Sequence, residues 1–157
     1  MSDIEVVAIS QERLDRMRER GQDEFGNPWT SRDALGWEPL RCCLRVAGEG
    51  ERIALICYTP WSESSPWMEA GPVFVHFGRC TGYDTPGTYP EALANAPRML
   101  NPFDHNGVRD YEHITFVQSD DDHEAAVRAI LDQPEVAFLH VRSATAGCFT
   151  FEVRPVS

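Results

Sequence analysis

The stretch Gly71-Pro72-Val73-Phe74-Val75-His76-Phe77-Gly78-Arg79-Cys80 predicts a strand with reactive side chains at its end. Residues 73–77 are mostly β-branched or aromatic, and glycine and proline bound the run, which is typical of a β-strand. Imidazole and thiol groups titrate nearest to neutral pH, so they serve proton transfer, nucleophilic attack and metal binding. The stretch therefore indicates both a sheet and a candidate site.

A second histidine–cysteine pair, His140 and Cys148, lies near the C-terminus. The runs 136–142 and 148–153 predict two strands, and 143–147 predicts the turn between them. If these strands and 73–77 are neighbours in one sheet, both pairs converge on one place.

The rest of the chain predicts further hairpins and two or three helices. Asn-Gly between two apolar runs is a strong hairpin signal, and serine or aspartate before a helical pattern is a typical N-cap. The expected strands are 4–9, 40–46 with 52–58, and 98–103 with 108–117, and the expected helices are 11–20, 119–133 and a turn at 91–95. The sequence thus predicts an α+β fold with a mainly antiparallel sheet.

Composition limits the function. A chain of 157 residues without an internal linker fits one domain over 1–157. The net charge of −11 and the pI near 4.8 argue against nucleic acid and against anionic membranes as partners. No run approaches the ~20 apolar residues of a membrane span, and the acidic N-terminus lacks the features of a signal peptide. The odd count of five cysteines indicates free thiols in a reducing cytoplasm.

Strand alternation predicts one semi-polar sheet face. In 40–46 the alternation places Cys42 with the core-like residues and Cys43 on the opposite face. The irregular segments 22–39 and 59–72 carry all four tryptophans and are expected to cover this face, either as anchored loops or as a recognition surface. The side chains expected on the face are Arg41, Cys43, Arg45, His76, His140, Arg142 and Cys148.

Several blocks resemble a bacterial family classed as a domain of unknown function, family number 1203. The resembling blocks are Arg41-Cys42-Cys43-Leu44-Arg45, Tyr58-Thr59-Pro60, 65–76 with Cys80, 136–140 and Gly147-Cys148-Phe149. The resemblance covers about 33–157 and leaves 1–32 as an N-terminal strand–helix extension. It implies no activity.

Three hypotheses follow for the function, with oligomeric state left open. The leading one is a small-molecule pocket with thiol–imidazole catalysis, whose catalytic candidates are Cys148, His140, His76, Cys43 and Glu69. Its ligand-binding candidates are Arg41, Arg142, Tyr58 and Trp67.

The alternatives are a zinc site and a non-catalytic interaction module. No cofactor is favoured, but His76, Cys80, His140 and Cys148 offer two nitrogens and two sulfurs, a set that suits tetrahedral zinc. The acidic run 120–124 is better explained as the start of a helix, where the helix dipole favours negative charge, than as a site for calcium or magnesium. The same cysteines and histidines also fit a purely structural role, in which each cysteine is a small buried apolar group and each histidine makes one hydrogen bond.

Overall fold

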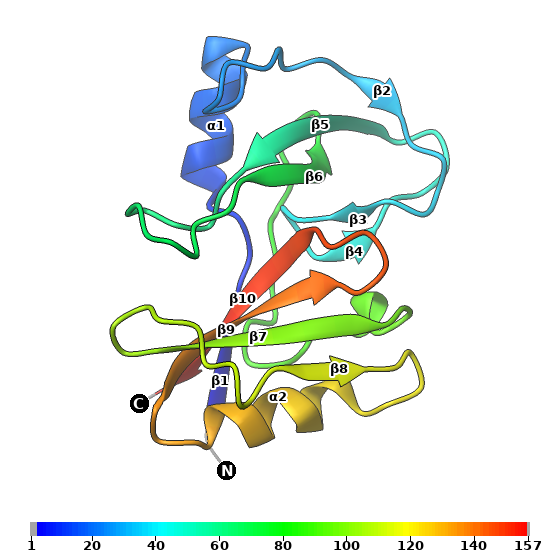
Figure 1. Cartoon of the computed structure of the whole chain (residues 1–157). Coiled ribbons are helices and arrows are strands. Elements are labelled where there is room, and N and C mark those ends of the chain that lie inside the picture. The colour runs from blue at the N-terminus through cyan, green and yellow to red at the C-terminus, as the bar shows by residue number, and fades with distance from the viewer. Residues whose placement is uncertain (1–2, 157) are drawn as a thin grey trace. The chain divides into compact units, whose positions relative to one another are not determined.

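The computed structural model describes residues 3–156 and confirms an α+β fold dominated by two mostly antiparallel sheets of five strands each (Figure 1). The elements are β1 (Asp3–Val7), α1 (Gln11–Arg20), β2 (Arg32–Asp33), β3 (Pro39–Leu40), β4 (Arg45–Val46), β5 (Arg52–Tyr58), β6 (Gly71–His76), the 3₁₀ turn η1 (Glu91–Leu93), β7 (Arg98–Asp104), β8 (Thr115–Val117), α2 (His123–Leu131), β9 (Val136–Ser143) and β10 (Phe149–Val156).

The chain divides into two compact units. The split unit holds the described residues of Met1–Val7 and Thr85–Ser157, and the inserted unit is Ala8–Asp84. The predicted extension 1–32 is thereby divided, because β1 belongs to the split unit and α1 to the inserted unit. The single domain over 1–157 stays a prediction, as does the boundary near residue 33.

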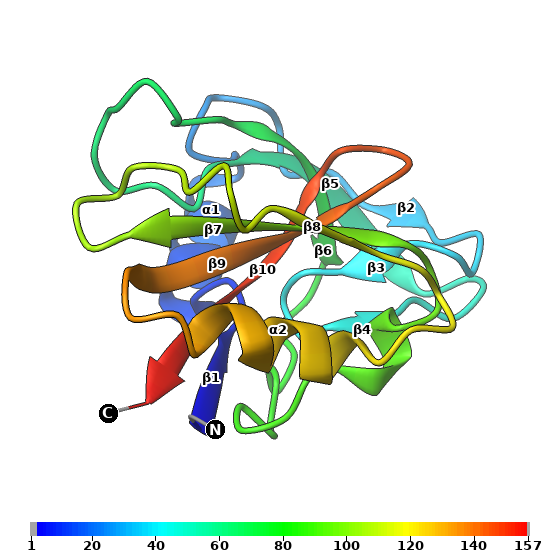
Figure 2. The same ribbon diagram turned by 60° about the horizontal axis from the view of Figure 1, so that its bottom comes forward.

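The split unit is an antiparallel sheet in the order β1-β10-β9-β7-β8, with α2 packed against β9 (Figure 2). The predicted C-terminal hairpin is confirmed by the β9–β10 pairing. Phe151 and Val153 of β10 are fully buried, as alternation predicts, but Thr150 and Glu152 on the other face are buried too. Both faces of β10 are therefore covered.

The inserted unit is a sheet in the order β2-β5-β6-β3-β4 with α1 beside it. The limits of α1 agree with the sequence. Ser10 caps its N-terminus by accepting from Arg13 N, and Gly21 ends it with φ +70°. Leu14 and Met17, the only apolar side chains of α1, are both buried.

The predicted hairpin of 40–46 with 52–58 is wrong. The chain forms only the two-residue strands β3 and β4, which pair with each other around the turn 41–44. β5 instead pairs with β2 and β6, and β3 joins β6 in the only parallel pairing between described strands. Alternation fails here because residues 41–44 form a turn, so Arg41, expected on the face opposite to Leu40 and Cys42, is buried with them.

The predicted strand 108–117 is also interrupted. The Asn106-Gly107 turn forms, with Gly107 at φ +77°, but regular pairing returns only at β8. The carboxylate of Asp110 accepts the backbone N–H groups of Glu112 and His113, and such side-chain bonds draw a backbone away from a strand ladder.

The prediction of a single semi-polar sheet face is also wrong. His76 lies on β6 of the inserted unit, and Cys43 lies in the turn beside it, whereas His140 lies on β9 of the split unit. The prediction assumed one sheet, and the chain forms two.

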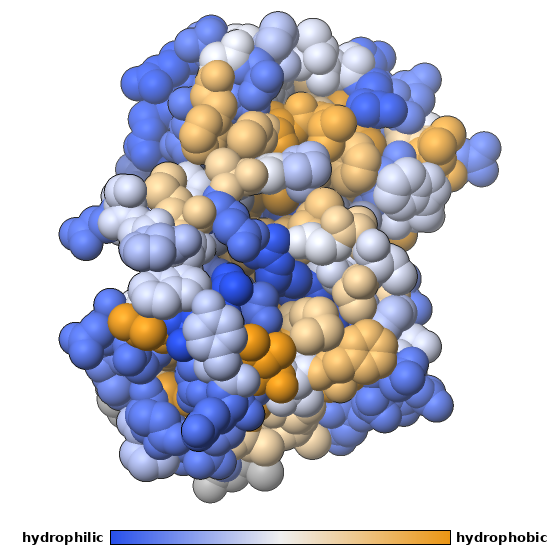
Figure 3. Space-filling model, viewed as in Figure 1, coloured by the Kyte–Doolittle hydropathy of each residue, from blue (hydrophilic) through white to orange (hydrophobic). Residues whose placement is uncertain are grey.

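The surface retains some apolar side chains. Apolar groups gather over the β5–β6 region in Figure 3. Leu55 of β5 is 40% exposed, and Trp37, whose ring contacts Phe74 of β6, is 60% exposed. Within residues 3–156, no helix has the length and apolar character needed to cross a membrane.

The core of the split unit allows a stability test. Leu139 lies in the central strand β9, is 0% exposed, and stands opposite Pro102 and Val153. Leu139→Ala is expected to lower the free energy of unfolding by about 2–5 kcal/mol, because it removes buried methyl groups and leaves a cavity. Urea unfolding followed by circular dichroism measures the change. Leu35→Ala, at a site 70% exposed, is the matched control and is expected to have little effect. Equal losses in the two variants would contradict this packing.

Candidate metal centre

The turn between β3 and β4 places two adjacent cysteines at the end of β6. Leu40 pairs with Phe74 in parallel, and Arg41 N donates to Phe74 O at 2.9 Å. The turn closes by a bond of 2.8 Å from Leu44 N to Leu40 O, with Leu44 at φ +59°. A non-glycine residue with positive φ is uncommon, and here the buried Leu44 side chain anchors it.

α1 binds both segments that contribute to the site. The guanidinium of Arg18 donates to three successive carbonyl oxygens at the end of β6, those of His76, Phe77 and Gly78, at 3.3, 3.0 and 2.9 Å. Gln11 Nε2 donates to Cys42 O at 3.3 Å and approaches Cys80 Sγ at 3.9 Å. The helix therefore holds the cysteine turn and the segment 76–80 in one arrangement.

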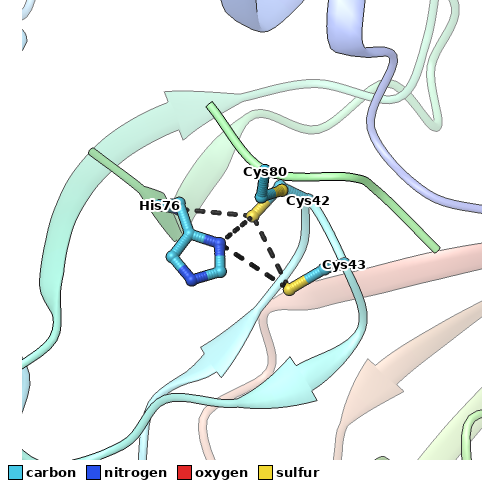
Figure 4. Close-up of side chains that lie close together, drawn as sticks. All are labelled: Cys42, Cys43, His76 and Cys80. Atoms are coloured by element: carbon cyan, nitrogen blue, oxygen red, sulfur yellow. Dashed lines mark hydrogen bonds between the residues drawn. The ribbon is translucent and has the colours of Figure 1, made fainter. Parts of the chain in front are cut away.

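Four side chains meet there: Cys42, Cys43, His76 and Cys80, which we call the thiol–imidazole cluster (Figure 4). His76 Nδ1 lies 3.4 Å from Cys42 Sγ and 3.8 Å from Cys43 Sγ, and the two sulfurs are 4.0 Å apart. All four ligand atoms lie within 4.8 Å of one another. Cys42 is fully buried, and the other three residues are half-buried.

The other nitrogen of the imidazole faces a carboxylate. His76 Nε2 lies 2.9 Å from Glu51 Oε2. Arg45 binds both oxygens of Glu51 at 2.8 Å, and Gly48 N donates to Oε1 at 2.7 Å. Arg45 Nη2 is also 3.0 Å from Nε2, but a guanidinium cannot accept, whereas the carboxylate can. Nε2–H therefore donates to Glu51, which leaves the lone pair of Nδ1 facing the sulfurs.

The crowded thiols titrate very differently from isolated ones. A hydrogen bond from Cys42, with further help from Gly82 N–H and His76, lowers the pKa of Cys80 to about 4. The bond to Cys42 likewise lowers the pKa of Cys43, while the same contacts raise that of Cys42. Burial lowers the pKa of His76, but Glu51 and the neighbouring sulfurs outweigh burial and raise it. Cys80 is thus a thiolate at neutral pH, and a thiolate is the form that binds metal or acts as a nucleophile.

The structure brings together three of the residues predicted for a site, Cys43, His76 and Cys80, and adds Cys42. Alternation had assigned Cys42 to a buried strand face. The available signal was the adjacency of two cysteines together with the His-x-x-x-Cys spacing of 76–80.

His140 and Cys148 belong to the split unit and to neither of the metal-compatible groups found among residues 3–156. His140 is 2% exposed, its Nε2 is 3.0 Å from Glu152 Oε1, and its ring packs against Phe103 and Phe149. The half-buried Cys148 directs its thiol at Ala146 O, 3.7 Å away. The predicted four-ligand set that includes this pair stays a prediction, as do the catalytic roles.

The predicted ligand-binding residues have structural partners. The buried Arg41 donates to Pro39 O at 2.6 Å, and Arg142 closes the β9–β10 turn through Gly147 O at 2.6 Å. Tyr58 receives a bond of 3.0 Å from Arg13, whose guanidinium also lies over its ring.

Two further candidates lie in the segment between β5 and β6. Trp67 is half-buried and Glu69 is exposed. The ligand-binding role of Trp67 and the catalytic role of Glu69 remain predictions, as do the binding roles of Arg41, Arg142 and Tyr58.

A second group, Asp110, His113 and Glu135, lies in the split unit. His113 Nδ1 is 2.6 Å from Asp110 Oδ2 and 3.9 Å from Glu135 Oε1. Asp110 Oδ1 already accepts two backbone N–H groups, so this aspartate shapes the loop. The thiol–imidazole cluster is the stronger candidate, because it brings four donors within 4.8 Å of one another and three of them are thiols, which suit a borderline metal such as zinc.

Comparison with known proteins gives a family and no activity. The family model that matches is described as "Protein of unknown function (DUF1203)" and covers residues 37–154. That range includes the whole thiol–imidazole cluster. Neither the curated proteins nor the solved structures gave a match.

His113 and His140, two of the four histidines of the split unit, are expected to titrate on opposite sides of the ordinary value of about 6.5. Burial lowers the pKa of His140, so the midpoint of its titration should lie below 6.5. The hydrogen bond to Asp110 raises the pKa of the half-buried His113, so the midpoint of its titration should lie above 6.5. Two-dimensional NMR of the imidazole nitrogens across pH 5–8 reads both midpoints in one sample. A midpoint of His140 above that of His113 would contradict these environments.

Proposed function

We propose a function for this chain, which belongs to the family described as "Protein of unknown function (DUF1203)": its thiol–imidazole cluster binds one zinc ion that stabilises the inserted unit. The proposal makes the protein a zinc-binding protein. The single observation that carries it is the convergence of three sulfurs and one imidazole nitrogen within 4.8 Å.

The spacing of the donor atoms supports a tetrahedral ion. Zinc bonds of about 2.3 Å to sulfur and about 2.0–2.1 Å to nitrogen place tetrahedral ligands about 3.8 Å apart for two sulfurs and about 3.6 Å apart for sulfur and nitrogen. The sulfurs of Cys42 and Cys43 are 4.0 Å apart, and His76 Nδ1 lies 3.4 and 3.8 Å from them. An ion at the centre thus requires movements of only tenths of an ångström in these three groups.

The chemistry of the donors favours zinc over the hard cations. Thiolates and imidazole select soft or borderline metals, whereas magnesium and calcium take oxygen ligands. The pKa of about 4 makes the thiolate the main form of Cys80 at neutral pH, so this ligand needs to lose few protons when the metal binds.

The surroundings of His76 match those of a metal-bound histidine. Such a histidine usually donates its second ring N–H to a carboxylate, which fixes the tautomer and the ring orientation. Glu51 takes this role, and Arg45 and Gly48 N–H hold its two oxygens. Arg45 balances the charge of Glu51, so the carboxylate that supports His76 adds no net charge beside the thiolates.

Four protein ligands indicate a structural ion. Catalytic zinc keeps an open position, whereas four protein ligands complete the tetrahedron. The ion would join the turn 41–44 to the loop after β6, where 77–88 contains no regular element. It therefore supplies a cross-link where backbone pairing is sparse.

Thiol chemistry at the same cluster is the second candidate function. It is favoured by the pKa of about 4 at Cys80, which keeps a half-buried thiolate beside an imidazole when no metal is bound. Rapid alkylation of one cysteine in protein that binds no zinc would support it over the zinc site. The small-molecule pocket remains a prediction.

Protein purified without chelators is expected to carry one zinc ion per chain, measured by inductively coupled plasma mass spectrometry. Cys80→Ser removes a thiolate ligand and should lower zinc affinity at least tenfold in a competition titration with a chromogenic chelator. Cys57→Ser is the matched control, because Cys57 is outside the cluster. A wild-type chain that takes up no added zinc would contradict the proposal.

Glu51→Gln is expected to weaken zinc binding by about 10–100-fold, the usual effect of losing such a supporting carboxylate. The neighbouring Glu49→Gln removes the same charge from an exposed position and should leave the affinity unchanged. The same chelator competition measures both. Equal effects of the two variants would mean that only net charge matters.

A further inference from the structure

The thiol–imidazole cluster is unevenly exposed. Cys42 is 0% exposed, whereas Cys43 and Cys80 are half-buried. Cys42 Sγ also accepts the backbone N–H of His76 at 3.2 Å, so the fold holds it on the inner side. Cys42 is therefore kept from solvent, whereas Cys43 and Cys80 are each partly accessible.

We propose that a peroxide oxidises Cys43 and Cys80 to a disulfide and so releases the zinc, which makes the centre a redox-controlled one. This inference rests on the proposed function, since it requires the ion to be bound. It adds regulation to what is otherwise a structural site.

The reaction balances with a peroxide as the oxidant. The Cys43 thiolate attacks one peroxide oxygen, the O–O bond breaks, and the departing oxygen takes a proton from solvent and leaves as water, so that Cys43 becomes a sulfenic acid. The Cys80 thiolate then attacks that sulfur, and the sulfenic oxygen leaves as a second water after taking another proton. In sum, two thiolates, one hydrogen peroxide and two protons give one disulfide and two waters. Two electrons pass from sulfur to oxygen.

The geometry favours Cys43 with Cys80 over the adjacent pair. Neighbouring residues have Cα atoms about 3.8 Å apart, which is shorter than the 4.4–6.8 Å of ordinary disulfides. A bond between Cys42 and Cys43 would therefore strain the turn that holds them. Cys43 and Cys80 come from separate segments, and their sulfurs already lie within 4.8 Å of each other.

The consequence for the metal follows from the count of ligands. The disulfide removes two of four donors, and Cys42 with His76 alone cannot complete a tetrahedral site. The new bond joins the same two segments that the ion joined, so the inserted unit keeps a cross-link and the change can be reversed by a thiol reductant.

The test treats zinc-loaded protein with hydrogen peroxide and follows zinc with a chromogenic chelator. We expect release of the one bound ion and its return to the protein after reduction and addition of zinc. Cys57→Ser, outside the cluster, should release zinc at the wild-type rate. Zinc that stays bound while peroxide oxidises the protein would overturn the inference and leave the zinc site intact. A wild-type chain that never binds zinc would overturn both.

Peptide mapping without reduction identifies the bond. Trypsin cuts after arginine, so 42–45 and 80–98 become separate peptides that only a bridge to Cys80 can join. Fragmentation between Cys42 and Cys43 then shows which of the two is linked, and we expect Cys43. A 42–45 peptide that is unlinked but two hydrogens lighter, a link through Cys42, or oxidation to sulfinic acids without any link would each overturn the inference.

Discussion

The parallel contact between β3 and β6 is the constraint on which the candidate centre depends. Leu40 and Phe74 pair, and Arg41 N–H donates to Phe74 O at 2.9 Å. This contact sets the turn 41–44 beside the last residue of β6, so two thiols meet an imidazole from a distant part of the sequence. Elsewhere in the inserted unit the strands pair in antiparallel fashion.

Polar groups around the centre form a layered arrangement. Arg45 and Gly48 N–H orient Glu51, Glu51 orients the imidazole of His76, and the imidazole presents Nδ1 to the sulfurs. Such outer contacts hold a metal ligand in position before the ion binds, which reduces the entropy lost on binding. The partly exposed Arg45–Glu51 pair contributes little to stability as a surface ion pair, so its orienting role is the more important one.

His140 of the split unit has an environment that contrasts with that of His76. His140 lies against the rings of three phenylalanines, and its Nε2 is 3.0 Å from Glu152 Oε1. Burial lowers the pKa of His140, whereas Glu51 and the neighbouring sulfurs outweigh burial and raise the pKa of His76. Two strand histidines that look alike in the sequence thus differ because one faces a core and the other faces thiols and a carboxylate.

The sequence by itself determined the local elements and the kinds of reactive group. Helix 11–20 was predictable because Ser10 and Gly21 are local capping signals, and the last hairpin was predictable because its strands alternate cleanly. The contact of His76 with Cys43 and Cys80 was predicted in part: the predicted sheet face included His76 and Cys43, and the predicted zinc set included His76 and Cys80. The tertiary structure alone decided that Cys42 joins them and that His140 lies in a different unit. The reason is physical: the apolar spacing of Leu40, Cys42 and Leu44 fits a strand or a buried turn equally well, and only the distant pairing with Phe74 selects the turn.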